Sequence, residues 1–198
     1  MPIPGGSTLV VTPIGAMPNS GTLGAWILLS LSKEPAFLSN GHVLNKVSAD
    51  VHLDTTGGPV IGAVLDSRHP LTIDAGVGKC SLARAWEYAT KAIGTDFTYR
   101  RFADPDNTEA VTMCGAVSGL GVADVDTTVN HMHSGRRCFE LRRWDDYLTW
   151  GVHGDSGTVI LNASEDIVGL YWGHTGGRHY AHYMTDVATL LGLEVLPG

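Results

Sequence analysis

Gly154-Asp155-Ser156-Gly157 leads directly into Thr158-Val159-Ile160-Leu161, so a serine between two small turn-forming stretches stands just before a strand-like run. Glycine permits the tight turn that an acyl-transfer serine needs, because its hydroxyl must be exposed while backbone N–H groups converge beside it. The N–H groups of Gly154 and Ser156 are the candidates for such an oxyanion hole. All four residues are also common turn formers, so an ordinary loop is the alternative for this stretch alone.

A histidine and an aspartate stand next to other apolar runs. His42 follows the apolar residues 36–38 and the turn-forming Ser39-Asn40-Gly41, where a loop presents side chains from a rigid base. Asp74 follows Ile73 and precedes two small residues, so we expect it to be partly buried. A buried carboxylate needs hydrogen-bond donors, and an imidazole N–H is a suitable one. Taken alone, the histidine could be a surface or core residue and the aspartate a turn cap.

The rest of the chain consists largely of short apolar runs separated by turn residues. The 25 glycines and 9 prolines predict many tight turns, which short strands need more than long helices do. Apolar spacing in residues 185–193 predicts a short terminal helix. The pattern indicates an all-β chain, either two small antiparallel barrels or a sandwich. We expect strands at residues 7–14, 23–31, 36–38, 60–65, 74–80, 111–114, 121–125, 138–142, 158–162, 167–172 and 179–184.

The three motifs together resemble those of the trypsin-like serine peptidases, and in particular compact bacterial and viral members. Leu38-Ser-Asn-Gly-His42-Val is similar to the histidine motif of that family, Ile73-Asp74-Ala to its aspartate motif, and Gly154-Asp-Ser156-Gly to its serine motif. The order histidine, aspartate, serine is that of the chymotrypsin fold. The resemblance implies two six-stranded antiparallel β-barrels packed with the active site between them, and a short C-terminal helix.

The resemblance also divides the chain. Residues 82–93 have some helical spacing and residues 103–107 form a predicted loop, so the series of strand-like runs is interrupted there. We expect an N-terminal β-barrel in residues 1–88, a connection in residues 89–107, and a C-terminal β-barrel in residues 108–198. The first barrel would carry His42 and Asp74, and the second would carry Ser156.

The activity that the resemblance implies is that of a hydrolase, a serine endopeptidase that cleaves peptide bonds through an acyl-enzyme on Ser156. His42 would act as general base and then general acid, and Asp74 would orient its ring. The backbone N–H groups of Gly154 and Ser156 would form the oxyanion hole. The alternative is a catalytically silent or partner-activated peptide-binding module on the same fold. An esterase or lipase fits poorly, because that fold places its serine before the acid and the histidine.

Substrate contacts are inferred from the resemblance alone. Trp150 stands where trypsin itself has an aspartate, so a preference for arginine or lysine is not expected. His174, His179 and His182 could hold an acidic side chain, and a small apolar side chain at the cleaved position is an equal alternative. The chain lacks the Ile or Val start whose amine pairs with the aspartate before the serine in trypsin, so Asp155 needs another partner. The expected substrate-binding residues are Trp150, His153, Tyr171, Trp172, Gly173, His174, Ala181 and His182.

Composition limits the partners and cofactors. The net charge of -7 argues against a broad surface for nucleic acid or an anionic membrane. The expected partner is a polypeptide substrate, with room for an activating or regulatory protein, and no cofactor is expected. No metal is expected either, because the potential ligands His131, His133, Cys114 and Cys138 match no zinc spacing. Three cysteines are a poor disulfide framework and the first residues lack a secretory signal, which predicts a cytoplasmic protein.

Overall fold

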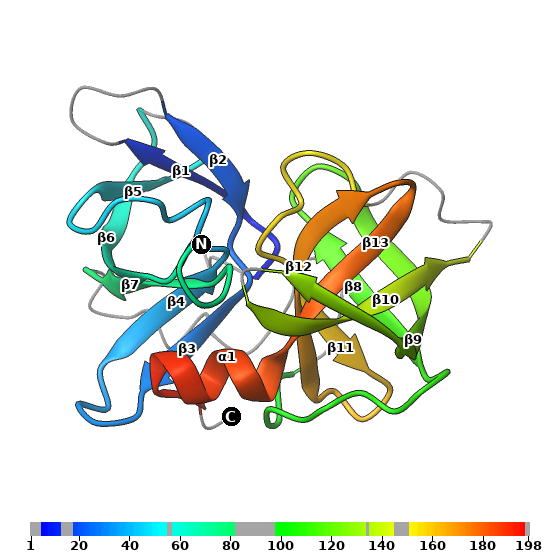
Figure 1. Ribbon diagram of the computed structural model, residues 1–198. Coiled ribbons are helices and arrows are strands. Elements are labelled where there is room, and N and C mark those ends of the chain that lie inside the picture. Colours follow the sequence, from blue (N-terminus) through cyan, green and yellow to red (C-terminus); the bar gives the residue numbers. More distant parts are fainter. Residues whose placement is uncertain are drawn as a thin grey trace.

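The computed structural model describes residues 5–12, 18–54, 57–81, 98–133, 135–144 and 151–196, apart from the side chains of residues 129 and 130. These residues are mostly strands, arranged as two β units side by side (Figure 1). The described part contains a single helix, α1 (Met184–Leu191), and nothing in it is long and apolar enough to span a membrane as a helix. The expectation of an all-β fold with a short C-terminal helix is confirmed.

The first unit is an antiparallel sheet of eight strands in the order β14-β3-β4-β7-β6-β5-β1-β2. Strands β2 and β3 lie toward opposite ends of this order, although only Leu23 and Gly24 separate them in sequence. The sheet therefore coils strongly and forms a barrel-like unit. Its strands are β1 (Thr8–Thr12), β2 (Asn19–Thr22), β3 (Ala25–Leu29), β4 (Pro35–Ser39), β5 (Asp50–Leu53), β6 (Val60–Ser67), β7 (Gly76–Cys80) and β14 (Leu193–Val195).

The second unit is a closed six-stranded barrel in the order β10-β13-β12-β11-β8-β9, with antiparallel pairing throughout. Strands β9 and β10 form a long hairpin, in which Arg136 pairs with His133 near the tip. The strands of this barrel are β8 (Ala110–Gly115), β9 (Gly119–His133), β10 (Arg136–Arg143), β11 (Val159–Asn162), β12 (Ile167–Thr175) and β13 (Arg178–Tyr183).

Three apolar clusters fill the units and join them. One lies inside the first unit around Trp26, and a second lies inside the closed barrel around Phe139. The third contains Ile73 of the first unit together with Leu170 of the barrel and Met184 of α1, all fully buried. Burying an aliphatic side chain contributes about 1.5–3 kcal/mol. The third cluster therefore holds the two units in a defined relation, which a site between them requires.

The structure adds three strands to those expected from the pattern, namely β2, β5 and β14, and it extends β9 to His133. Strand β14 returns the end of the described chain to the first unit. It pairs with β3 of the first unit, because α1 carries the chain away from the closed barrel, so the segment 108–198 does not lie wholly in the second barrel. The helical spacing noted in residues 82–93 lies outside the described residues.

Candidate active site

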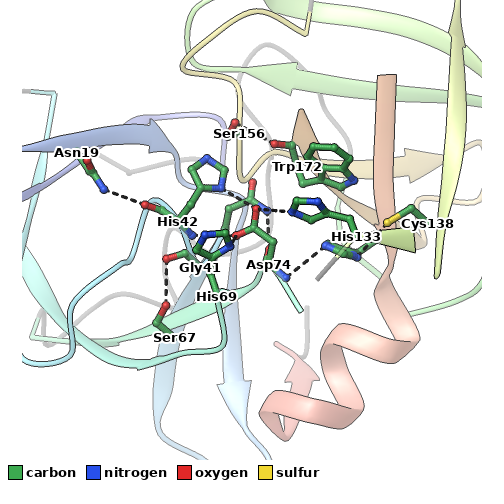
Figure 2. Close-up of polar contacts among 12 residues, drawn as sticks. Asn19, Gly41, His42, Ser67, His69, Asp74, His133, Cys138, Ser156 and Trp172 are labelled. Carbon is green, nitrogen blue, oxygen red and sulfur yellow. Dashed lines mark hydrogen bonds and ion pairs between the residues drawn. The ribbon is translucent and has the colours of Figure 1, made fainter. Parts of the chain in front are cut away.

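His42 and Asp74 meet because they flank neighbouring strands. Ser39 at the end of β4 pairs with Gly76 at the start of β7. His42 follows β4 by three residues, and Asp74 precedes β7 by two. His42 Nδ1 lies 2.7 Å from Asp74 Oδ2, and the backbone N–H of His42 donates to Asp74 Oδ1 at 2.8 Å (Figure 2). A carboxylate only accepts hydrogen bonds, so the ring proton is on Nδ1 and Nε2 keeps its lone pair.

Asp74 is buried, and further imidazoles surround it. Burial by itself would raise the pKa of Asp74, but the imidazoles of His133 and His42 outweigh this effect and hold that pKa well below its usual range. His182 Nε2 accepts the backbone N–H of Asp74 at 3.3 Å, which leaves the proton of His182 on Nδ1, 3.3 Å from Cys138 Sγ. Burial lowers the pKa of His182 to about 3, so this ring is neutral near pH 7.

Ser156 occupies a turn that only glycines allow. Gly154 has φ 103° and Gly157 has φ 98°, and a Cβ on Gly157 would lie 2.2 Å from Ser39 Oγ. The Ser156 hydroxyl donates to the carbonyl of Trp172 at 3.3 Å, and no hydrogen bond joins it to His42, although the structure describes both residues. His42 and Ser156 nevertheless line one cavity of about 370 Å³, together with Pro18, Asn19, Ser20, His153 and Gly154.

The serine turn also presents backbone donors to this cavity. Among the described residues, neither the N–H of Gly154 nor that of Ser156 donates to a protein acceptor. Both residues line the cavity that contains His42. Free N–H groups beside a serine hydroxyl can stabilise an oxyanion, and removal of one such donor costs about 2.7–4 kcal/mol of transition-state stabilisation.

Strand β2 ties the serine turn to the first unit. Thr22 N–H donates to Ser156 O at 2.9 Å, and the Thr22 hydroxyl donates to Gly154 O at 2.8 Å. The same hydroxyl accepts the N–H of Ala116 at 3.1 Å. Thr22 is fully buried. One side chain of the first unit therefore helps to position the serine turn of the second.

Asp155 finds its partners among neutral donors. It is fully buried, and its Oδ1 accepts the N–H groups of Val117 at 3.0 Å and Ser118 at 3.1 Å. Its Oδ2 accepts the Ser118 hydroxyl at 2.5 Å and the N–H groups of Gly151 at 3.0 Å and Val152 at 2.9 Å. Several N–H and O–H donors can stabilise a buried carboxylate without a cation. The aspartate before the serine thus needs no chain-terminal amine in this structure.

Comparisons with known proteins agree with this architecture. No protein-family model matches the chain, and no curated protein matches it. A glutamic-acid-specific serine protease that uses a histidine triad in substrate binding has a TM-score of 0.75 at 16% identity, over 98% of this chain and 100% of that one. Thermobifida fusca protease A has a TM-score of 0.74 at 17% identity, and Nocardiopsis protease 0.73 at 16%, each over 100% of both chains. This chain has the chymotrypsin fold.

On this chymotrypsin fold the expected substrate-binding residues lie in different environments. His153 lines the cavity with Ser156. On β12, Trp172 and Gly173 are partly exposed and His174 is exposed. Tyr171 and Ala181 are buried, and the Tyr171 hydroxyl donates to Gly151 O at 2.8 Å. Trp150 lies outside the described residues.

The three histidines that suggested an acidic pocket do not point the same way. His179 and His182 are three residues apart on β13, so their side chains lie on opposite faces of the strand. His182 is fully buried against Asp74, and His179 Nδ1 lies 2.9 Å from the Tyr171 hydroxyl. Burial lowers the pKa of His179 to about 4, so this ring is neutral near pH 7. Only His174 of the three is exposed.

Two further residues lie beside Asp74: His69, which sequence reasoning missed, and His133, which it considered only as a potential zinc ligand with His131, Cys114 and Cys138. Within the described chain, His69, Asp74 and His133 form the one group of three metal-ligating side chains whose ligand atoms all lie within 4.8 Å of one another. The other histidine of the His131-x-His133 pair stacks on Tyr180 instead, with 4.1 Å between ring centroids. Cys114 and Cys138 are buried free thiols. The local signals were a histidine just after a strand end at position 69 and the His131-x-His133 pair, and neither indicated a position beside Asp74.

Proposed function

We propose that the chain is a serine endopeptidase that hydrolyses peptide bonds through an acyl-enzyme on Ser156. The observation that carries the proposal is the His42–Asp74 pair. Its 2.7 Å contact holds the Nδ1 proton, so Nε2 is free to act as a base in the cavity that His42 shares with Ser156. The similarity in fold to serine proteases supports a protease of some kind.

In the proposed reaction, Ser156 Oγ attacks the carbonyl carbon of the peptide while His42 Nε2 removes the hydroxyl proton. The Asp74 carboxylate stabilises the resulting imidazolium, and the N–H groups of Gly154 and Ser156 stabilise the oxyanion. The imidazolium then gives its proton to the leaving amine, and water hydrolyses the acyl-enzyme by the same steps. The serine hydroxyl must first turn from Trp172 O toward His42.

A fluorophosphonate probe, which reacts covalently with activated serines, tests this proposal. We expect the wild-type chain to be labelled at Ser156, as located by peptide mass mapping, and Ser156→Ala to remain unlabelled. His42→Ala should slow labelling by about 10²–10⁴-fold, the usual contribution of a general base. The exposed Ser164→Ala serves as the matched control and should label like the wild type. Labelling of His42→Ala at the wild-type rate would show that His42 is not the base.

One observation favours a second candidate, a partner-activated or catalytically silent peptide-binding module. The Ser156 hydroxyl donates a hydrogen bond to Trp172 O and makes none with His42. Trp172 belongs to β12, and its carbonyl becomes available when a bound ligand or partner displaces the hydroxyl. This candidate predicts no labelling of the isolated chain. Labelling that begins only after a proteome-derived peptide mixture or cell extract is added indicates activation, and binding of peptides without any labelling indicates the silent module.

Cleavage specificity is part of the proposal and follows from Trp150, which replaces the aspartate of trypsin at that position of the motif. We expect little cleavage after arginine or lysine. A proteome-derived peptide library, digested with the wild type and with Ser156→Ala as the blank, gives the preferred residue directly. Enrichment of arginine and lysine before the cleaved bond would contradict this expectation.

A further inference from the structure

The Asp74 carboxylate lies between two imidazoles that the proposed reaction does not use. His69 Nδ1 is 3.3 Å from Asp74 Oδ1, and His133 Nε2 is 3.4 Å from Asp74 Oδ2. His69 lies between β6 and β7 of the first unit, whereas His133 ends β9 of the closed barrel. The three side chains therefore meet across the junction of the two units (Figure 2).

Both of these ring nitrogens lack a hydrogen-bond partner among the described residues, although both atoms are buried. Their contacts with Asp74 are close but do not have the geometry of a hydrogen bond. A buried nitrogen without a partner costs free energy, because it has lost its contact with water. Two such nitrogens that face one carboxylate need either well-oriented N–H···O hydrogen bonds to it or a ligand that they share with it.

The separations of these atoms suit a small divalent cation. Zn²⁺ binds nitrogen and oxygen ligands at about 2.0–2.2 Å, so neighbouring ligands of a tetrahedral site lie about 3.3 Å apart. His69 Nδ1 lies 3.3 Å from one Asp74 oxygen and His133 Nε2 lies 3.4 Å from the other, and one ligand atom from each of the three residues lies within 4.8 Å of the other two. Two imidazoles and one carboxylate also form a common protein ligand set for Zn²⁺, with water as the fourth ligand.

We propose that His69, Asp74 and His133 form a Zn²⁺ site at the junction of the two β units. The side chains of His69 and His133 are 33% and 26% exposed, although their two ligand nitrogens are buried, and Asp74 is 2% exposed. The site differs from the four ligands that the sequence offered, since only His133 is common to both. His182 is not a ligand, because its Nε2 accepts the backbone N–H of Asp74.

The site is regulatory because it shares an oxygen with the His42–Asp74 pair. Asp74 Oδ2 faces both His133 Nε2 and His42 Nδ1. Zn²⁺ bound to the Asp74 carboxylate neutralises the negative charge that would stabilise the His42 imidazolium during attack. It also places a positive charge beside the His42 ring. Zinc binding therefore inhibits the enzyme reversibly. This consequence rests on the proposed peptidase function, whereas the metal site itself does not.

Calorimetric titration of ZnCl₂ into metal-free protein tests the site without reference to catalysis. We expect one Zn²⁺ per chain in the wild type. His69→Ala and His133→Ala should each weaken binding by at least roughly 10- to 100-fold, which is the cost of losing a residue that only hydrogen-bonds to a metal ligand. His131→Ala is the matched control, because it removes a histidine of the same hairpin and should bind zinc like the wild type. Absence of binding, or equal weakening by all three substitutions, overturns the site.

Thermal unfolding keeps the test informative if an alanine variant is poorly folded. Zn²⁺ should raise the melting temperature of the wild type and of His131→Ala, because a ligand that binds only the folded state stabilises it. The milder His133→Gln variant should melt without zinc near the wild type and gain much less from added zinc. An equal gain in His133→Gln and the wild type would count against His133 as a ligand.

The effect on activity is measured separately, as the rate of fluorophosphonate labelling with and without ZnCl₂. The wild type should lose labelling on zinc addition and regain it with EDTA, and His133→Gln should lose much less. Zinc that binds through His69 and His133 without slowing labelling would overturn only the inhibition. If the wild type is never labelled, the proposed peptidase fails, while calorimetry still decides the metal site.

Discussion

Asp155 carries a charge into the interior without an ion pair among the described residues. Five neutral donors surround its two oxygens, four backbone N–H groups and the Ser118 hydroxyl. Gly115 is part of this arrangement, because a Cβ at that position would lie 2.2 Å from Asp155 Oδ1. The carboxylate thereby links the turn after β8 to the segment before Ser156. A buried charge of this kind is stabilising only while its donors stay in place.

Ser118→Ala removes one donor and leaves the Asp155 oxygen less satisfied. We expect it to lower the free energy of unfolding by about 1.5–3 kcal/mol, the range for a hydrogen bond to a charged group. Urea unfolding measures this change, with the exposed Ser164→Ala as the control. Equal stability of the two variants would mean that the backbone donors alone satisfy Asp155.

Strand β2 matters most at the element scale, because Thr22 contacts three parts of the serine region. Its backbone N–H and its hydroxyl hold Ser156 O and Gly154 O, and the hydroxyl accepts Ala116 N–H. Thr12 at the end of β1 offers a useful contrast, since its buried hydroxyl has no partner among the described residues. In these two neighbouring strands, the Thr22 hydroxyl therefore both donates and accepts a hydrogen bond, whereas the Thr12 hydroxyl does neither among the described residues.

Thr22→Val leaves the buried Gly154 carbonyl and the partly buried Ala116 N–H without their partner. A buried group left unsatisfied costs about 1–3 kcal/mol, and the partly buried N–H costs less. We expect a clear loss of stability in urea unfolding, together with slower fluorophosphonate labelling, because the turn that carries Gly154 loses an anchor. Thr12→Val removes an unsatisfied hydroxyl, so we expect its stability to stay within about 1 kcal/mol of the wild type or to rise. A larger loss from Thr12→Val than from Thr22→Val would contradict this account of β2.

The whole molecule should lose stability in acid because it buries neutral histidines. Burial lowers the pKa of His182 to about 3 and that of His179 to about 4, from the unfolded value of 6.5. Between pH 6.5 and these two folded-state pKa values, the two histidines are protonated in the unfolded chain and remain neutral in the folded chain. Stability therefore falls as the pH falls through this window, by up to about 1.4 kcal/mol per pH unit for each ring.

His182→Gln removes one of these rings, so its stability should depend less steeply on pH than that of the wild type between pH 6 and about 4. The expected difference in slope is up to about 1.4 kcal/mol per pH unit. Urea unfolding at a series of pH values measures it, and the exposed His153→Gln is the control. Parallel curves for the wild type and His182→Gln would show that His182 does not govern the acid response.

Local chemistry is what the sequence by itself determined. Glycines around Ser156, a histidine after an apolar strand and alternating apolar runs act over a few residues, so most of the strands and the terminal helix could be predicted, and the three motif residues could be proposed. Tertiary structure decided the rest. Asn19-Ser20-Gly21-Thr22 has little strand propensity and becomes β2 by pairing with β1, and β14 joins a sheet whose other strands lie far away in sequence. His133 reaches Asp74 only because β9 is long and the third apolar cluster fixes the two units, and such contacts between distant residues leave no local pattern to read.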